Sequence, residues 1–315
     1  MRLFVLGSFV QACCWSVARL PVAGETFLAS DINIEAGGKG LNVAICARRL
    51  GAEVNITLGI GEDDAANNVL SLLQREQIGV QHCYRLAKQS GYGVGLISAC
   101  GQNIIAVYPG PNLLLTAEHI KLAYSEITSS DLVYAQFETS LTSIEQAFII
   151  AKQHQILTVL NPSPWQNFTK KLLAMTDILI VNEVEAAQLF DIEITEIQLK
   201  LGQNLTLAIQ RLNELATQFY ANWGGCCLCV TLGEYGSVAF LPDGKIEYIA
   251  AYTVKAIDTV GAGDAFASGF CVAYLLKKPI EEVLRYGNAC GGIITSQLGV
   301  LNALPNSEKV ADFLS

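Results

Sequence analysis

Short apolar runs alternate along the chain with segments whose apolar residues recur about every 3.6 positions. The apolar runs have the length of buried strands and lie at residues 2–6, 54–59, 132–134, 157–160, 178–181 and 228–231. The helical patterns lie at residues 143–152, 183–190, 205–218, 265–276 and 280–296. Because βαβ units place helices on both faces of a parallel sheet, this alternation predicts an α/β fold with a mainly parallel central sheet.

Composition narrows the class of protein. Of the 315 residues, 51% are hydrophobic and 16% are charged, which is typical of a chain that folds around a large core. The net charge of -9 disfavours a phosphate-backbone contact surface, so nucleic acid is not an expected partner. The apolar stretches fall short of the roughly 20 residues that span a bilayer, which predicts a soluble protein without membrane contact.

The ten cysteines lie mostly among apolar neighbours, where a free thiol behaves as a small buried side chain. This usage favours a reduced, cytoplasmic protein. The cluster Cys226, Cys227 and Cys229 has no second ligand pair at zinc-site spacing, so no structural zinc is expected.

Two segments interrupt the βα rhythm. Residues from about 9 to 34 and from about 92 to 107 alternate in the manner of antiparallel strands. They predict a small sheet beside the central one. Such a sheet could cover a site at the carboxyl edge of the parallel strands, or it could simply add edge strands.

The most informative local sequence is residues 258–266, a run of small residues between a strand-like stretch at 248–257 and an apolar helix. Gly261, Ala262 and Gly263 leave backbone N–H groups open at a helix N-terminus, which favours an anion. Asp264 follows in the first turn, where the helix dipole favours its ionised form. A carboxylate beside a bound anion suits phosphoryl transfer, although an acid in a first turn is also an ordinary capping residue.

Three further segments are less specific. Residues 36–44 form a glycine-rich turn in which Lys39 and Asn42 could bind a polyol, or could be solvated residues of a βα turn. Asn182 and Glu185 share a face of a first helical turn, where they could hold Mg²⁺ through water or form a capping box. Residues 230–236 are a strand that runs into a turn.

Together and in this order, the four segments resemble the PfkB family of carbohydrate kinases, in particular its ribokinase-like members. The resemblance rests on a Gly-Gly-Lys-Gly-x-Asn segment, an Asn-x-x-Glu motif, a Thr-Leu-Gly-x-x-Gly turn and a late Asp-Thr-x-Gly-Ala-Gly-Asp signature. It implies a ribokinase-like three-layer sandwich over residues 1–315, forming one kinase domain, with the two interrupting segments as a small β-sheet lid. It also implies ATP and Mg²⁺ as cofactors and a homodimer formed through the lid.

The resemblance assigns roles to individual residues. Asp264 would be the catalytic base, with Gly261, Ala262 and Gly263 as the anion hole. The acceptor would contact Gly38, Lys39, Asn42, Glu138 and Asp264. The nucleotide would meet Asn182, Thr231, Gly233, Gly236, Gly263 and Asn288, while Asn182 and Glu185 would hold Mg²⁺ through water.

Two departures from the family pattern matter. Ribokinase-like proteins carry Gly-Ser-x-Asn-x-Asp at the end of the first strand, but this chain has Ala12 in place of the sugar-binding Asp. Without that carboxylate, sugar hydroxyls would be left unpaired, which argues against ribose itself as the substrate. The resemblance also implies a monovalent-cation site, made by Asp258, Val260, Ile294, Gln297 and Gly299. Ala303 replaces a Ser expected near it, which leaves K⁺ activation open.

The expected function is therefore ATP-dependent phosphorylation of a hydroxyl of a sugar or sugar-like molecule. A sugar-phosphate kinase or a nucleoside kinase of the same family is an alternative. A metabolite sensor without catalysis on the same scaffold is the alternative from another class.

Overall fold

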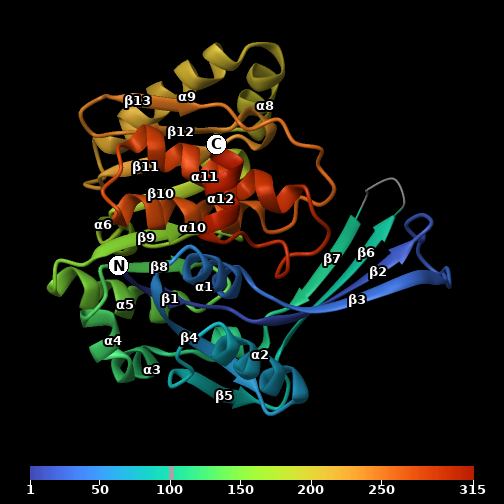
Figure 1. Ribbon diagram of the computed structural model, residues 1–315. Helices are drawn as coiled ribbons and strands as arrows, with labels where there is room; N and C mark the ends of the chain where they lie inside the picture. The colour runs from blue at the N-terminus through green and yellow to red at the C-terminus, as the bar shows by residue number, and fades with distance from the viewer. Residues whose placement is uncertain (99–102) are drawn as a thin grey trace.

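The computed structural model describes residues 1–98 and 103–315, and a nine-stranded main sheet runs through its centre (Figure 1). The strand order is β13 (Ile246–Ile249), β12 (Ser237–Phe240), β11 (Cys227–Thr231), β10 (Ile178–Asn182), β9 (Leu157–Asn161), β8 (Leu132–Gln136), β1 (Arg2–Leu6), β4 (Glu53–Gly61) and β5 (Cys83–Ala87). Strands β11 through β5 in this order are parallel, and β12 and β13 close one edge in antiparallel pairing. The carboxyl ends of the parallel strands therefore meet along one edge of the sheet.

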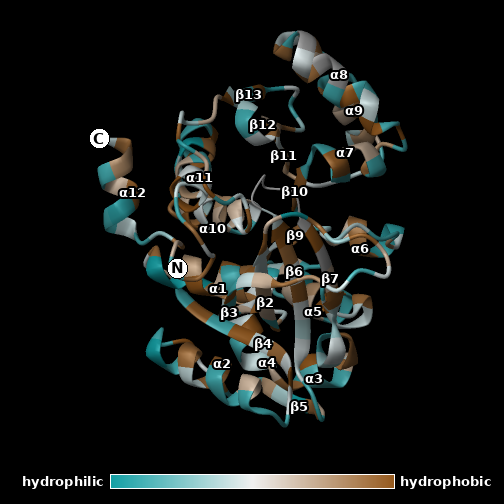
Figure 2. Ribbon diagram, turned by 90° about the vertical axis from the view of Figure 1, so that its right-hand side faces the viewer, coloured by the Kyte–Doolittle hydropathy of each residue, from teal (hydrophilic) through white to brown (hydrophobic). Residues whose placement is uncertain are grey.

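Helices cover both faces of the main sheet. One layer contains α1 (Lys39–Arg49), α2 (Asp64–Arg75), α10 (Ala262–Leu275), α11 (Ile280–Thr295) and α12 (Ser307–Leu314). The other layer contains α3 (Ala117–Leu122), α4 (Tyr124–Thr128), α5 (Leu141–Gln153), α6 (Lys170–Ala174), α7 (Glu183–Leu189), α8 (Ile194–Gln203) and α9 (Leu205–Tyr220). Figure 2 shows β9, β10 and β11 between α10 and α11 on one side and α6 and α7 on the other.

Each layer has its own apolar core because strand side chains alternate between the faces. Along β1, Leu3 and Val5 join the core under α1 and α10, while Phe4 and Leu6 join the core under α5. All four side chains are fully buried. This continuous burial of successive residues is typical of a parallel strand covered on both faces, and the predicted three-layer α/β architecture is confirmed.

The strands and helices expected from periodicity are all present, with ends shifted by a few residues. One boundary was wrong: the strand-like stretch at residues 248–257 ends as strand β13 at Ile249, and residues 250–257 form no strand. The side chain of Asn288 instead donates hydrogen bonds to the carbonyls of Ile249 and Ala250. The loop that begins there runs along the site described below.

The two interrupting segments form a separate four-stranded small sheet, which extends away from the main sheet (Figure 1). Its order is β3 (Ala29–Gly37), β2 (Val10–Val17), β6 (Gly91–Ser98) and β7 (Asn103–Tyr108). The pairs β2–β3 and β6–β7 are antiparallel as expected, but β2 and β6 run parallel. The parallel contact arises because both hairpins leave the main sheet in the same direction.

The side chain of Asn112, in the 3-10 turn η1 (Gly110–Leu114), joins the roots of both hairpins. Its Oδ1 accepts from the N–H of Phe9 at 2.8 Å, and its Nδ2 donates to the carbonyls of Phe9 and Pro109, each at 2.8 Å. Phe9 precedes β2 and Pro109 follows β7. One buried amide therefore joins the point where the chain enters the first hairpin to the point where it leaves the second. Within the described residues, no helix is long and apolar enough to cross a bilayer.

Candidate active site

The first turn of α10 places Asp264 at the carboxyl edge of the main sheet. The helix begins after Gly261, whose φ of 80° is left-handed and therefore favours glycine. A Cβ at position 261 would also lie 2.8 Å from Cγ1 of Val300, so the turn requires glycine on two grounds. A Cβ at Gly263 would have no atom within 4 Å, which leaves that side of the helix N-terminus open as expected of an anion hole, while the N–H of Ala262 donates to the carbonyl of Thr259 at 3.3 Å.

Asp264 is 6% exposed and accepts a hydrogen bond at 2.8 Å from Nδ2 of Asn42 on α1. Burial raises the pKa of Asp264 to about 6, against the lowering effects of Lys39 and the Asn42 bond; Glu138 and Glu185 add to the rise. Desolvation thus outweighs Lys39 and Asn42, and the net pKa is raised although the carboxylate lies in a first helical turn, where the dipole is expected to favour its ionised form. A carboxylate with this pKa is mostly ionised at neutral pH and is suited to accept a proton there.

The start of α1 approaches Asp264 through close backbone contact with β1. Gly38 has a φ of 116°, and a Cβ at Gly40 would lie 2.4 Å from Cα of Gly7. The helix therefore enters the site at a distance that only glycine permits, and it brings Asn42 to Asp264. Asn42 is 5% exposed, and within the described part of the chain its Oδ1 has no hydrogen-bond partner. A buried acceptor without a donor is costly in a ligand-free site and indicates a position for a ligand hydroxyl.

Glu138 and Lys39 face the same region. Oε2 of Glu138 accepts from Oγ of Ser8 at 2.6 Å and from the N–H of Lys39 at 2.9 Å. Burial lowers the pKa of Lys39, but the carboxylates of Asp264, Glu138 and Glu185 more than offset this, so its pKa is raised. The ammonium group therefore stays charged. The role of Ser8 in holding Glu138 was not predicted, and the strand-to-turn sequence Gly7-Ser8 was its only signal.

Asn182 and Glu185 form a reciprocal capping box at the start of α7. Oδ1 of Asn182 accepts from the N–H of Glu185 at 2.8 Å, and Oε2 of Glu185 accepts from the N–H of Asn182 at 3.0 Å. The capping box, which was the alternative to a Mg²⁺ site for this pair, is thus confirmed. Glu185 is nevertheless 5% exposed, and its charge acts on both Lys39 and Asp264. The capping box fixes a buried carboxylate at the edge of the site.

A cavity of about 500 Å³ lies beside the N-terminus of α10. It is lined by the predicted nucleotide residues Thr231, Gly233, Gly236, Gly263 and Asn288. Asn182 is not among its described lining residues; it pairs in register with Thr231 on the neighbouring strand. Sequence reasoning missed further lining residues, among them Ala251, Tyr252, Thr253, Val254, Ala256, Phe266, Gly291, Gly292 and Thr295.

Asn288 shapes this cavity through its hydrogen bonds to protein groups. Its Oδ1 accepts from Oγ of Ser237 at 2.9 Å, and its Nδ2 donates to the carbonyls of Ile249 at 3.0 Å and Ala250 at 3.2 Å. The predicted nucleotide residue therefore lines the cavity while it anchors the loop after β13. Gly236 permits the close approach of that loop, since a Cβ there would lie 2.1 Å from the carbonyl oxygen of Ile249.

Of the five residues expected at a monovalent-cation site, Ile294 lies in the last turn of α11, and Asp258, Val260, Gln297 and Gly299 lie in the loops before α10 and after α11. The carboxylate of Asp258 accepts from the N–H of Val260 at 3.0 Å and from the N–H of Gly299 at 3.3 Å. The carbonyl of Ile294 accepts from the N–H of Gln297 at 3.1 Å. Ala303 is buried and adds no oxygen from its side chain. The loops are thus held together by the residues proposed to bind the cation.

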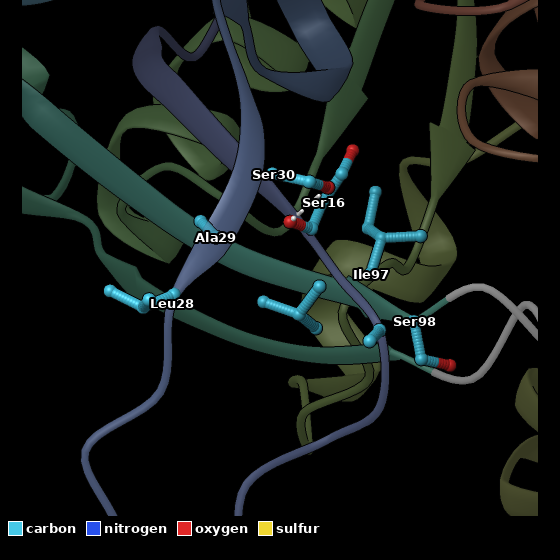
Figure 3. A pocket seen from close by; sticks show the side chains of 8 residues that line it. Ser16, Leu28, Ala29, Ser30, Ile97 and Ser98 are labelled. Atoms are coloured by element: carbon cyan, nitrogen blue, oxygen red, sulfur yellow. Dashed lines mark hydrogen bonds between the residues drawn. The ribbon is translucent and has the colours of Figure 1, made fainter.

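The small sheet contributes a surface of small side chains near α1. A Cβ at Gly37 would lie 3.5 Å from Cβ of Ala12 and 3.7 Å from Cγ2 of Val10. Because Gly37 leads directly into Gly38 and Lys39, Ala12 lies on the sheet face that continues into the candidate acceptor site. A second cavity, at the outer end of the small sheet (Figure 3), is lined by none of the predicted site residues.

Comparison with known proteins agrees with this geometry. The pfkB family carbohydrate kinase profile matches residues 2–307. A ribokinase of Haemophilus influenzae is 31% identical over 313 residues, which cover 99% of this chain and 98% of the relative. A deoxyribokinase of Salmonella typhi is 26% identical over 317 residues, with coverage of 100% and 99%.

Among solved structures, a ribokinase from Thermotoga maritima superimposes with a TM-score of 0.82 at 25% identity, covering 99% of this chain and 98% of that one. The similarity therefore includes both sheets. From its matching family profile and its full-length relatives, this chain belongs to the pfkB family of carbohydrate kinases.

Proposed function

We propose that the protein transfers the γ-phosphoryl group of ATP to a hydroxyl of a sugar or sugar-like molecule, with Asp264 as the catalytic base. The observation that carries this is the position of Asp264: a buried carboxylate with a pKa raised to about 6, beside an open helix N-terminus and a cavity of about 500 Å³. Both sheets would act together as one kinase domain, with the small sheet as its lid.

In the proposed reaction, a bond forms between the acceptor oxygen and the γ-phosphorus while the bond from that phosphorus to the β–γ bridging oxygen breaks. The hydroxyl proton passes to Asp264, and ADP leaves with the former bridging oxygen. The N–H groups of Gly261, Ala262 and Gly263 stabilise the charge on the transferred group. Asn42 keeps the carboxylate of Asp264 oriented through its 2.8 Å hydrogen bond.

The acceptor would bind against the start of α1. The unpartnered Oδ1 of Asn42 offers an acceptor to a sugar hydroxyl, and the Lys39 ammonium and Glu138 carboxylate offer complementary groups. Gly38 leaves the backbone accessible. One wall of this site would therefore be polar, while Val10, Ala12 and Gly37 on the small sheet form a wall of small apolar groups.

The apolar wall bears on the choice of acceptor. Ribokinase and deoxyribokinase are both relatives of this chain, and Ala12 cannot accept a hydrogen bond from a hydroxyl. We therefore propose an acceptor that does not need a carboxylate at position 12, rather than ribose. Ala12→Asp is the matched test, because it restores the carboxylate of the family pattern and should raise kcat/KM for ribose relative to the native acceptor.

For Mg²⁺, the residues at the site fit the metal's preference for oxygen ligands and retained water. The buried Glu185 carboxylate has lone pairs beyond those used by the capping box. Asn182 and Glu185 would hold the ion through water, and bound Mg²⁺ would neutralise phosphate charge. For K⁺, backbone carbonyls near Asp258 would supply oxygens; comparing rates in K⁺ and in tetramethylammonium at equal ionic strength tests that site.

The exposed face of the small sheet supports a homodimer. Seven bulky apolar residues share one side of the sheet, in register across the strands. They are Trp15, Ile32, Ile34, Tyr92, Val94, Ile104 and Tyr108, which are 39% to 57% exposed. A contiguous apolar surface of this kind marks an interaction site, and a second copy of the chain would cover it. The free thiols of the described cysteines support a cytoplasmic location.

The decisive experiment measures ADP release with ATP and Mg²⁺ against a panel of pentoses, deoxypentoses, hexoses, their phosphates and nucleosides. A strong signal with a free sugar supports the proposal. A signal confined to sugar phosphates or to nucleosides would assign the chain to the corresponding alternative. Nucleotide binding without turnover on any acceptor would contradict the catalytic role and favour a sensor.

A further inference from the structure

A carboxylate on the small sheet is bonded to the loop that follows α11. Glu35, near the end of β3, accepts from the N–H of Val300 at 3.2 Å and 3.3 Å through its two oxygens, and from the N–H of Leu301 at 3.4 Å. Glu35 is separated from these residues by more than 260 positions in the chain. This contact therefore joins β3 of the small sheet to the loop that follows α11.

The same loop touches the proposed anion hole. The side chain of Val300 occupies the space beside Gly261, where a Cβ on the glycine would lie 2.8 Å from Cγ1 of Val300. The neighbouring Gly299 donates its N–H to Asp258, which begins the segment that carries the anion hole. A shift of Val300 would therefore press on, or release, the turn that sets the N–H groups of Gly261 to Gly263.

The other side of the loop is fixed to α1. Nη1 of Arg49 donates to the carbonyls of Leu301 at 2.6 Å and Leu304 at 3.2 Å. Arg49 also forms an ion pair with Glu76, the residue that follows α2. Arg49 thus holds the loop from the helix layer and Glu35 holds it from the small sheet, so a displacement of the small sheet would act on the loop through Glu35.

Glu35 also lies beside the acceptor wall. It pairs in register with Ala12 across β2 and β3, on the face where Ala12 meets Gly37. An acceptor bound against this face would fix the same strands that present Glu35 to the loop. The path from acceptor to anion hole then runs through β3, Glu35, Val300 and Gly261.

We propose that Glu35 is a positioning residue that couples the placement of the small sheet to the geometry of the anion hole. This inference rests on the anion hole proposed above. Removing the carboxylate should leave ground-state binding of nucleotide intact, because Glu35 does not line the nucleotide cavity. It should lower the rate of the chemical step, because a misplaced anion hole loses stabilisation of the transferred group.

The test is steady-state kinetics of Glu35→Ala with ATP, Mg²⁺ and the best acceptor of the panel. The expected result is a fall in kcat of about 10- to 100-fold with an ADP Kd within about twofold of wild type. Glu35→Gln keeps an uncharged acceptor oxygen and should recover part of the loss. The control is Asp31→Ala, which removes an exposed carboxylate from the same strand, bonded within the described structure to the adjacent N–H of Ile32, and should leave kcat unchanged.

A second arm tests the path. Val300→Ala removes the side chain beside Gly261 but keeps the N–H that Glu35 binds, so its effect on kcat should be non-additive with that of Glu35→Ala. Wild-type kcat in Glu35→Ala, additive effects in the double variant, or a loss confined to the acceptor KM would each overturn the inference. Asp264→Asn, assayed in parallel, separates the two proposals. If Asp264→Asn abolishes turnover while Glu35→Ala keeps the wild-type kcat, the proposed function is supported and the coupling through Glu35 is contradicted.

Discussion

The two sheets of this protein differ in what covers them. The main sheet is buried on both faces, and its large side chains, such as Tyr134 and Phe4, are fully enclosed. The small sheet has one face on which the small residues Ala12, Gly37 and Gly93 lie with Glu35, and an opposite face on which Trp15 and Tyr108 are 42% and 57% exposed. The difference teaches that burial stabilises the main sheet, whereas the small sheet presents the two faces proposed to bind the acceptor and a second copy of the chain.

The largest effect is expected where the two sheets meet. Asp264→Asn keeps the shape of the side chain and its contact with Asn42 but cannot accept the hydroxyl proton. Turnover should fall by about 10²- to 10⁴-fold, while calorimetric titration should give unchanged ADP binding. Turnover near the wild-type rate would contradict the assignment of the base.

A core substitution in the main sheet should be costly in stability. Phe148 on α5 is fully buried in the core under β1 and β8. Phe148→Ala should lower the free energy of unfolding by about 3–5 kcal/mol, since it leaves a cavity. Urea denaturation measures this, with Leu207→Ala, at a 52% exposed position of α9, as the control.

The matching substitution on the small sheet should change assembly more than folding. Ile34 is 51% exposed on the apolar face, and Ile34→Asp places a charge in the proposed dimer contact. Light scattering should show a monomer, with the unfolding free energy per subunit changed by no more than about 1 kcal/mol. Ser16→Asp, on the opposite face of β2, is the control; a dimer that persists in Ile34→Asp would show that this face does not form the interface.

The smallest effect is the dependence on pH. Burial raises the pKa of Asp264 from 3.8 to about 6, so the working ionised form is lost as the pH falls through about 6. Below that value kcat/KM should fall roughly tenfold per pH unit. The folded protein also binds this proton more tightly than the unfolded chain, so this group reduces stability as the pH rises from about 4 to 6. An activity profile flat down to pH 5 would mean that another group limits the rate.

Much of the main sheet could be predicted from the sequence because buried parallel strands and amphipathic helices leave strong periodic signals. The short strands β5 and β12 were not predicted, and of the edge strand β13 only the last two residues were, because each of these strands has four or five residues and little alternation. The parallel contact between β2 and β6 could not be predicted either, since alternation reports which face a residue takes and not the direction of its neighbour.

The candidate site also has residues that could be predicted from the sequence and residues that could not. Asp264, Asn42 and Lys39 lie in glycine-rich turns whose composition already indicates ligand approach. The loop at residues 251–254 leaves no such signal, because it lines the nucleotide cavity with ordinary residues. Glu35 was missed because its partners are backbone N–H groups, which any residue could supply, at the far end of the chain.

Asn112 has a consequence for how this protein can change over evolution. One buried amide fixes both roots of the small sheet at Phe9 and Pro109. Mutations beyond those roots alter the surface offered to an acceptor without disturbing the attachment to the kinase centre. Acceptor preference could therefore change while the chemistry is retained, and Ala12, the third residue of β2, lies on the part of the small sheet where such changes would act.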